Sequence, residues 1–208
     1  MDLEYKRLAV AELARYLSAF PNVDLIDAVK EIVEEGLAVL NEDDDDLQMK
    51  PMYVIYESSS NCSRLVLRAN LYSVAAAGFQ PLVDPNRVAN AVWILNLFTT
   101  EIPIATVWST RIAVCKAAQT FIHKCIGISD LTLPEESLLP FWESLKIVAS
   151  DRGYESVRTA AARTVGKLVE WVKGHPEWTR TQQKIRGELP GVIEAETSTV
   201  VQAEYRSS

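Results

Sequence analysis

Apolar residues recur at steps of three and four along most of the chain, which is the period of one face of an α-helix. The pattern is clearest between Leu138 and Val169, where two apolar helical segments flank the polar turn Asp151-Arg152-Gly153. The first segment carries too many apolar residues for one narrow stripe, and such a helix is covered on more than one side. A single helical hairpin cannot bury two apolar faces alone. The pattern therefore predicts that this hairpin stacks on neighbours.

Four stretches of the chain align on an arginine, at Arg7, Arg64, Arg111 and Arg158, and successive arginines are 57, 47 and 47 residues apart. The upper HEAT and armadillo repeat period is about 47 residues. Apolar residues stand three, seven and ten positions after each arginine, as one buried helical face requires. These are Val10, Ala14 and Leu17; Leu67, Leu71 and Val74; Val114, Ala118 and Phe121; and Ala161, Val165 and Leu168. We expect the four arginines to occupy equivalent places near the starts of the second helices of hairpins.

The sequence thus predicts an all-α fold, a HEAT/ARM-type α-solenoid of about four to five helical hairpins with no β-sheet of consequence. Residues 1–208 are expected to form a single repeat array with two irregular parts. An acidic loop inserted at residues 41–50 accounts for the longer first interval, and a tail at 177–208 offers two weaker helices split by Pro190-Gly191. Chance matches in any apolar helical protein are the alternative, which two equal spacings and three shared apolar offsets disfavour.

The same pattern predicts which residues are buried. Four should lie in the core of the central hairpin, namely Trp142, Leu145, Val165 and Leu168. The first helix shows apolar residues on several sides and already carries the arginine pattern of a second helix. We therefore expect the chain to be a fragment of a longer protein, with an exposed apolar patch around some of Leu3, Leu8, Val10 and Leu13.

Charge and cysteine content narrow the function classes. The net charge of −7 argues against a nucleic-acid binder, which normally shows a basic face, and against docking on anionic membranes. No apolar run approaches the roughly 18 residues that a membrane span needs. Three cysteines without a short paired spacing suggest reduced thiols, and no signal-peptide pattern is present at the start. We expect a cytoplasmic and nuclear protein.

Candidate chemistry is sparse, and the sequence predicts no catalytic, cofactor-binding or metal-ligating residue and no cofactor. His123 and His175 are expected to be surface or capping residues rather than catalysts. Cys115 and Cys125 are not spaced as metal ligands, and no phosphate-binding or dinucleotide-binding glycine pattern occurs. The acidic run Glu42 to Asp46 could be an interaction tail or a metal site, although a solvated loop explains it better.

The repeated arginines allow two interpretations. They could bind the phosphates or carboxylates of a partner. They could instead open each second helix and pair with acids or carbonyls in the turn between helices. Recurrence at the repeat period favours the structural interpretation, because binding sites rarely recur with the repeat.

Several motifs, in their order and intervals, resemble a known family. The matching pieces are Tyr5-Lys6 with Ala9-Val10, Leu67 through Gly78 with Pro81, Trp108 to Ala118, and above all Tyr154-Glu155-Ser156-Val157-Arg158-Thr159-Ala160. Together they resemble the last repeats of the large HEAT-repeat proteasome adaptor and scaffold proteins, in a fungal version. The acidic run and Phe79-Gln80 depart from that pattern.

The resemblance implies a protein that bridges the core particle and the regulatory particle of the proteasome and monitors the assembled complex, without catalysis. It implies protein partners and marks no contact residues in this chain, so the binding residues are unknown from sequence. Two alternatives stay open. One is a HEAT/ARM array of another class, such as a transport receptor or a tubulin-handling factor, and the other is an enzyme with an all-helical fold, which the missing constellation of catalytic residues disfavours.

Overall fold

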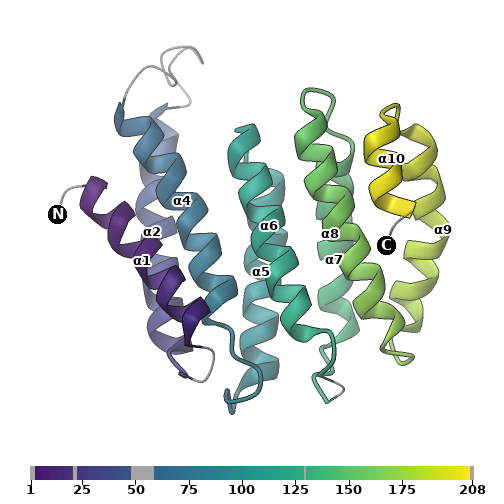
Figure 1. Cartoon of the computed structure of the whole chain (residues 1–208), viewed down its shortest axis with the longest axis horizontal. Helices are drawn as coiled ribbons and strands as arrows, with labels where there is room; N and C mark the ends of the chain where they lie inside the picture. Colours follow the sequence, from purple (N-terminus) through teal and green to yellow (C-terminus); the bar gives the residue numbers. More distant parts are fainter. Residues whose placement is uncertain (1–2, 21–22, 48–58, 129, 207–208) are drawn as a thin grey trace. The chain divides into compact units, whose positions relative to one another are not determined.

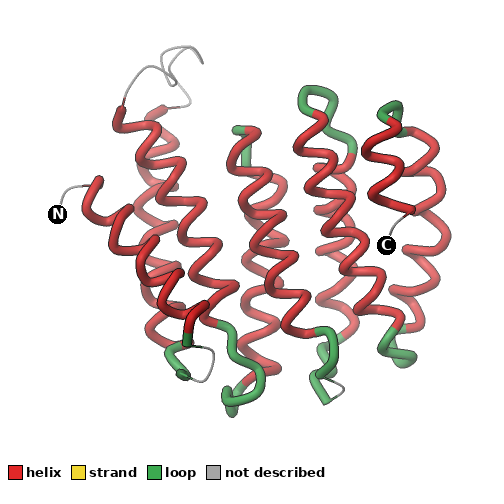
Figure 2. The backbone as a smooth tube through the Cα atoms, in the orientation of Figure 1, coloured by secondary structure: helices red, strands yellow, loops and turns green. Residues whose placement is uncertain are grey.

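A computed structural model of the chain describes residues 3–20, 23–47, 59–128 and 130–206. All regular secondary structure in these residues is α-helical, as Figure 2 shows, and the prediction of an all-α, HEAT/ARM-like repeat fold is confirmed. The chain divides into two compact units, residues 1–84 and residues 85–208. Each unit is described by itself below, and the expectation of a single array over residues 1–208 stays a prediction.

The first unit contains α1 (Leu3–Ala19), α2 (Ile26–Leu47) and α4 (Ser59–Gly78). Helices α2 and α4 form a hairpin, and α1 packs along α4 (Figure 1). Two glycines allow the close approach of α2 and α4. A Cβ atom at Gly36 would lie 2.8 Å from Leu71, and one at Gly78 would lie 2.7 Å from Val29. Larger residues at either position would therefore push the two helices apart.

The second unit contains three hairpins in two layers (Figure 1). The first helices are α5 (Arg87–Ile104), α7 (Glu135–Ala149) and α9 (Thr179–Ala195). The second helices are α6 (Trp108–Cys125), α8 (Glu155–Lys173) and α10 (Thr199–Arg206). Each helix packs on its neighbour within the layer, so that α7 lies between α5 and α9, and α8 lies between α6 and α10. This is the stacking that the sequence pattern predicts.

The predicted core residues are buried. Trp142, Leu145, Val165 and Leu168 are at most 1% exposed. In α4, α6 and α8, all the residues three, seven and ten positions after the arginine are buried as well. In α1 only Leu17 of this set is fully buried, whereas Val10 and Ala14 remain partly exposed. Helix α1 thus follows the repeat pattern with less of its apolar face covered by described residues.

The expected apolar surface of α1 is present in part. Leu8 is 54% exposed, and Tyr5, Tyr16 and Phe20 on the same segment are exposed too. Val10 and Leu13 are half-buried, and the side chain of Leu3 lies outside the described residues. In the part of the chain that the structure describes, no helix combines the length and apolar character that crossing a bilayer requires.

Two predicted boundaries are wrong. Helix α2 continues to Leu47, so residues 41–47 of the expected acidic loop are helical, and residues 48–50 lie outside the described residues. A helix already formed extends at little cost, because each added residue gains a hydrogen bond. Helix α9 also runs through Pro190 and ends at Ala195. Proline removes one backbone donor, and its exposed position in α9 lets the helix continue past it.

Candidate functional site

The repeat arginines lie where the alignment places them, within the first six residues of α1, α4, α6 and α8. In the second unit they reach into the turns that join first and second helices. Arg111 donates from Nε to the carbonyl oxygen of Ala105, at 2.6 Å, in the turn before its own helix. Its guanidinium also pairs with the carboxylate of Asp151 in the corresponding turn of the next hairpin. One arginine therefore joins two successive turns.

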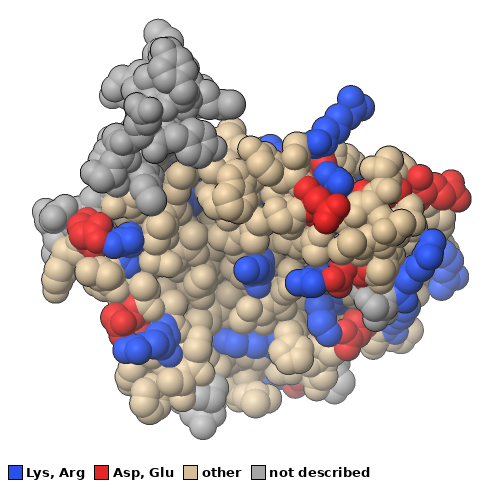
Figure 3. All heavy atoms as spheres, turned by 45° about the horizontal axis from the view of Figure 1, so that its top comes forward, with Lys and Arg blue, Asp and Glu red and all other residues tan. Residues whose placement is uncertain are grey.

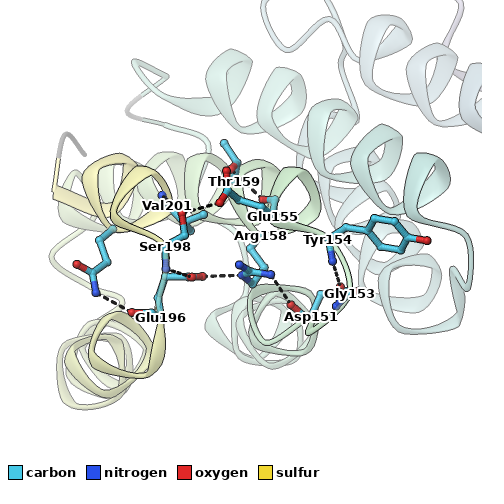
Figure 4. A network of polar contacts seen from close by, with 10 residues as sticks. Asp151, Gly153, Tyr154, Glu155, Arg158, Thr159, Glu196, Ser198 and Val201 are labelled. Atoms are coloured by element: carbon cyan, nitrogen blue, oxygen red, sulfur yellow. Dashed lines mark hydrogen bonds and ion pairs between the residues drawn. The ribbon is translucent and has the colours of Figure 1, made fainter.

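Arg158 repeats this arrangement one hairpin later, and Figure 4 shows it between Asp151 and Glu196. It donates to the carbonyl oxygen of Asp151 at 3.0 Å and to the carboxylate of Glu196 at 2.8 Å. Gln202 then donates to the carbonyl oxygen of Glu196 at 2.6 Å. We call this continuous series of contacts the turn ladder; its members are Ala105, Arg111, Asp151, Arg158, Glu196 and Gln202.

Gln202 is a member of the turn ladder that the sequence alignment missed. It occupies the fourth position of α10, as Arg111 and Arg158 do in α6 and α8. It lies 44 residues after Arg158, because the last hairpin is shorter than the 47-residue repeat, and a search at fixed spacing passes over it. A search for any side-chain donor at the fourth position of each second helix would have found it.

The two acids of the turn ladder are buried and satisfied. The side chain of Asp151 is 5% exposed, and that of Glu196 is 4% exposed. Asp151 also accepts hydrogen bonds from the backbone N–H groups of Gly153 and Tyr154, so it orders the turn that leads into α8. Glu196 accepts one from the N–H of Ser198 and thereby orders the turn before α10. The ladder thus fixes each turn and links it to the next.

Opposing effects set the pKa values of these acids. Burial raises the pKa of Asp151, but hydrogen bonds from Tyr154, Gly153 and Arg111 outweigh it and the net shift is downward. Burial likewise raises the pKa of Glu196, and its bonds to Arg158 and Ser198 hold the value below the ordinary one. Both acids are therefore ionised at neutral pH, as the ion pairs require.

In the first unit, the two remaining arginines have local partners. Arg64 donates to the carbonyl oxygen of Leu40 at 3.3 Å, and Leu40 lies inside α2, seven residues before the end of that helix. Arg7 pairs with Glu4 on its own helix. Arg111 and Arg158 thus pair with acids and carbonyls of the turns, as the structural interpretation predicts. These partners of Arg64 and Arg7 lie within helices instead of turns.

Two surface grooves flank the helices of the second unit. The first lies between α8 and α9, is about 330 Å³ in volume, and is lined mainly by apolar side chains. The second lies between α6 and α8, is about 380 Å³ and has a more polar lining that includes Lys116, Gln119, Thr159 and Arg163. Over the C-terminal helices in Figure 3, acidic and basic side chains lie next to one another instead of forming a patch of one sign.

An exposed aromatic pair lies at the starts of α6 and α8. The rings of Trp108 and Tyr154 are 5.9 Å apart between centroids, and the residues are 41% and 49% exposed. Exposed tryptophan and tyrosine are enriched among the residues that dominate protein interfaces. The pair adjoins the turn ladder, because Tyr154 is also a backbone donor to Asp151.

The histidines and the two cysteines whose side chains the structure describes lie apart from any reactive cluster. His123 is exposed, whereas His175 is buried, so of the two expected roles, surface or capping, only capping remains for His175. Its ring stacks on Trp178 with centroids 4.0 Å apart, and its carbonyl oxygen caps the turn into α9 by accepting from Trp178 N–H. Cys115 and Cys125 are free and buried. Burial raises the pKa of the Cys115 thiol to about 12 and raises that of Cys125 as well, which leaves both thiols protonated and unreactive.

A metal site is not found in the described part of the chain, where no three histidine, cysteine or acidic side chains cluster suitably. The acidic run at 42–46 falls on residues whose side chains lie outside the described set. What the described geometry offers is an ordered stack of hairpins with grooves and exposed aromatic residues. That combination favours the binding of other macromolecules over catalysis.

The chain matches a model of a known protein family. The model of the family "ECM29, C-terminal ARM-like repeats" matches residues 2–207, which is nearly the whole chain. No curated protein and no solved structure matches the chain significantly.

Proposed function

Because the chain belongs to the family of ECM29 C-terminal ARM-like repeats, we propose that it is a non-catalytic protein-binding segment of a proteasome adaptor. ARM-like repeats generally serve as scaffolds, and stacked helical repeats present an extended surface to protein partners. In this proposal the array contacts the core particle and the regulatory particle, helps to bridge them, and takes part in monitoring their assembly. The observation that carries the proposal is the family match over residues 2–207.

Further observations support a binding role over catalysis. The described histidines and cysteines are packed or isolated, and the most buried of the ion-paired acids belong to the turn ladder. The exposed Trp108–Tyr154 pair and the apolar groove are features of binding surfaces. The proposal includes action in the cytoplasm and the nucleus, and partners that are proteins and not nucleic acids or membranes.

Affinity capture tests the proposal. The chain, tagged at one end, is used as bait in a fungal cell extract, and captured proteins are quantified by mass spectrometry. We expect proteasome subunits to be the most enriched group. The matched control bait is a HEAT/ARM array of a transport receptor with the same tag. Enrichment of transport cargo or tubulin by this chain, with no enrichment of proteasome subunits over the control, would contradict the proposal.

A further inference from the structure

The groove between α8 and α9 is apolar along its floor and charged at its edges. Val169 and Val172 of α8 face Ile185, Leu189 and Ile193 of α9. The residues from α9 recur at steps of four, so they form one stripe along that helix. A stripe of this kind normally packs against another helix.

The described residues of α10 lie along only part of α8. Helix α8 has 19 residues and α10 has eight, which at 1.5 Å per residue gives lengths of about 28 Å and about 12 Å. Polar contacts fix α10 beside the first half of α8, where Ser198 bonds to Glu155 and Arg163 pairs with Glu204. The second half of α8, with Val169 and Val172, lies beyond these contacts. Figure 1 shows α10 alongside only part of α9.

Two cations border this open stretch. Lys173 lines the groove from α8 and Arg186 lines it from α9, and both are exposed. Neither has an acidic partner among the described residues, whereas nearby Lys167 and Lys184 are paired with Glu170 and Glu143. An occupant with carboxylates beside its apolar residues would satisfy both cations.

We propose that this groove, bordered by Val169, Lys173, Arg186 and Leu189, binds a short acidic amphipathic helix of a protein partner. The helix would have two to three turns, apolar residues at i, i+3 or i+4 and i+7, and Asp or Glu at its flanks. It would occupy the position beside α8 that α10 occupies farther along. The inference rests on the proposed function in that it takes the occupant to be a protein segment.

The test uses a synthetic 15-residue helical peptide with leucines at the apolar positions, glutamates at the flanks and a fluorescent label. Titration with the full chain, followed by fluorescence anisotropy, should give saturable binding. The same peptide with lysine in place of each glutamate should bind about tenfold more weakly, because it would meet Lys173 and Arg186 with like charge. Equal binding of the two peptides, or no binding of either, would overturn the proposal.

Charge reversal locates the site. The double variant Lys173→Glu/Arg186→Glu should bind the glutamate peptide about tenfold more weakly and should bind the lysine peptide more tightly than the wild type does. The matched control is Arg152→Glu/Lys116→Glu, which reverses two exposed cations outside this groove and should leave both affinities unchanged. Thermal melts followed by circular dichroism establish that both variants fold. Equal effects of the two double variants would refute the assignment to the groove.

A second variant tests the apolar floor, and sedimentation tests the alternative occupant. Leu189→Asp, at a half-exposed position, should abolish peptide binding while the chain stays folded. If it instead removes self-association and the peptide never binds, the groove takes a second copy of the chain and the proposal fails. Proteasome capture by the wild type without peptide binding would defeat this inference alone. Peptide binding without proteasome capture would defeat the proposed function alone.

Discussion

The hairpin α7–α8 and the hairpin α9–α10 share their polar links but differ in how much apolar surface they bury. Each turn carries a buried acid, Asp151 or Glu196, paired with an arginine from the hairpin before it. Ten of the 19 residues of α8 are buried, whereas only Thr181 and Ile185 are buried in the 17 residues of α9. The same ion pairs at the turns thus occur in a hairpin whose apolar surface is largely buried and in one whose apolar surface is partly exposed.

This difference indicates that the polar contacts and the apolar packing of a repeat have separate roles. The turn ladder fixes the turns relative to one another, and its geometry persists in the last hairpin although that hairpin is short. Apolar burial supplies most of the stabilising free energy, and the last hairpin leaves part of its apolar stripe uncovered. The uncovered part is the groove that we assign to a partner helix.

Removing a core side chain from the covered hairpin should have the largest effect. Trp142 is fully buried in α7, and its Nε1 donates to Glu188 of α9 at 2.8 Å. Trp142→Ala should lower the free energy of unfolding by about 3–5 kcal/mol, and Leu168→Ala by about 2–5 kcal/mol. Leu189→Ala in α9 should cost less than about 1 kcal/mol, because that side chain is half-exposed. Urea denaturation followed by circular dichroism measures the free energy of unfolding of all three variants. If Leu189→Ala lowered it as much as Leu168→Ala does, the two hairpins would not differ in apolar burial as described.

Breaking the turn ladder at one of its buried ion pairs should have the next largest effect. Asp151→Ala leaves Arg111 without its carboxylate and removes the two hydrogen bonds that order the turn before α8, so we expect a loss of about 3 kcal/mol. Arg158→Ala, which leaves Glu196 buried without its cation, should cost about 2–3 kcal/mol. A loss below about 1 kcal/mol for both variants in denaturant melts would show that apolar packing alone fixes the turns.

Stability should also fall with pH through the ladder acids. The pKa values of Asp151 and Glu196 lie below the ordinary 3.8 and 4.5 in the folded chain. A depressed folded pKa contributes stability above the ordinary pKa, and that contribution is lost as pH falls through the folded value. Urea melts between pH 6 and pH 3 should show a steep loss below about pH 4.5 in the wild type. Asp151→Asn/Glu196→Gln should flatten that slope, and parallel slopes would refute the assignment.

The smallest effect is expected at the exposed pair between α8 and α10. The side chains of Arg163 and Glu204 are 56% and 24% exposed. Arg163→Ala should change the free energy of unfolding by less than about 0.5 kcal/mol, because water screens the pair. A loss comparable to that of Arg158→Ala, measured in the same melts, would mean that exposure does not decide the strength of these links.

The sequence predicted the repeats well because their signal is periodic. Arg64, Arg111 and Arg158 start equivalent helical faces, and the apolar residues after them are buried as their spacing requires. The end of α2 and the continuity of α9 through Pro190 were not predicted, since helix ends depend on weak local preferences. The sequence predicted that acids in the turns could pair with the arginines, but it did not predict that Asp151 and Glu196 would pair with arginines of the preceding hairpin. These pairs depend on contacts between residues 38 and 40 positions apart, which no local pattern encodes.

Direct binding to purified particles tests the central claim that this chain is a proteasome-binding repeat segment. The chain is immobilised, and purified fungal core particle, regulatory particle and assembled proteasome are passed over it in biolayer interferometry. The account predicts saturable binding to the assembled proteasome and to at least one of its isolated parts. Absence of binding to all three by a folded chain would contradict it.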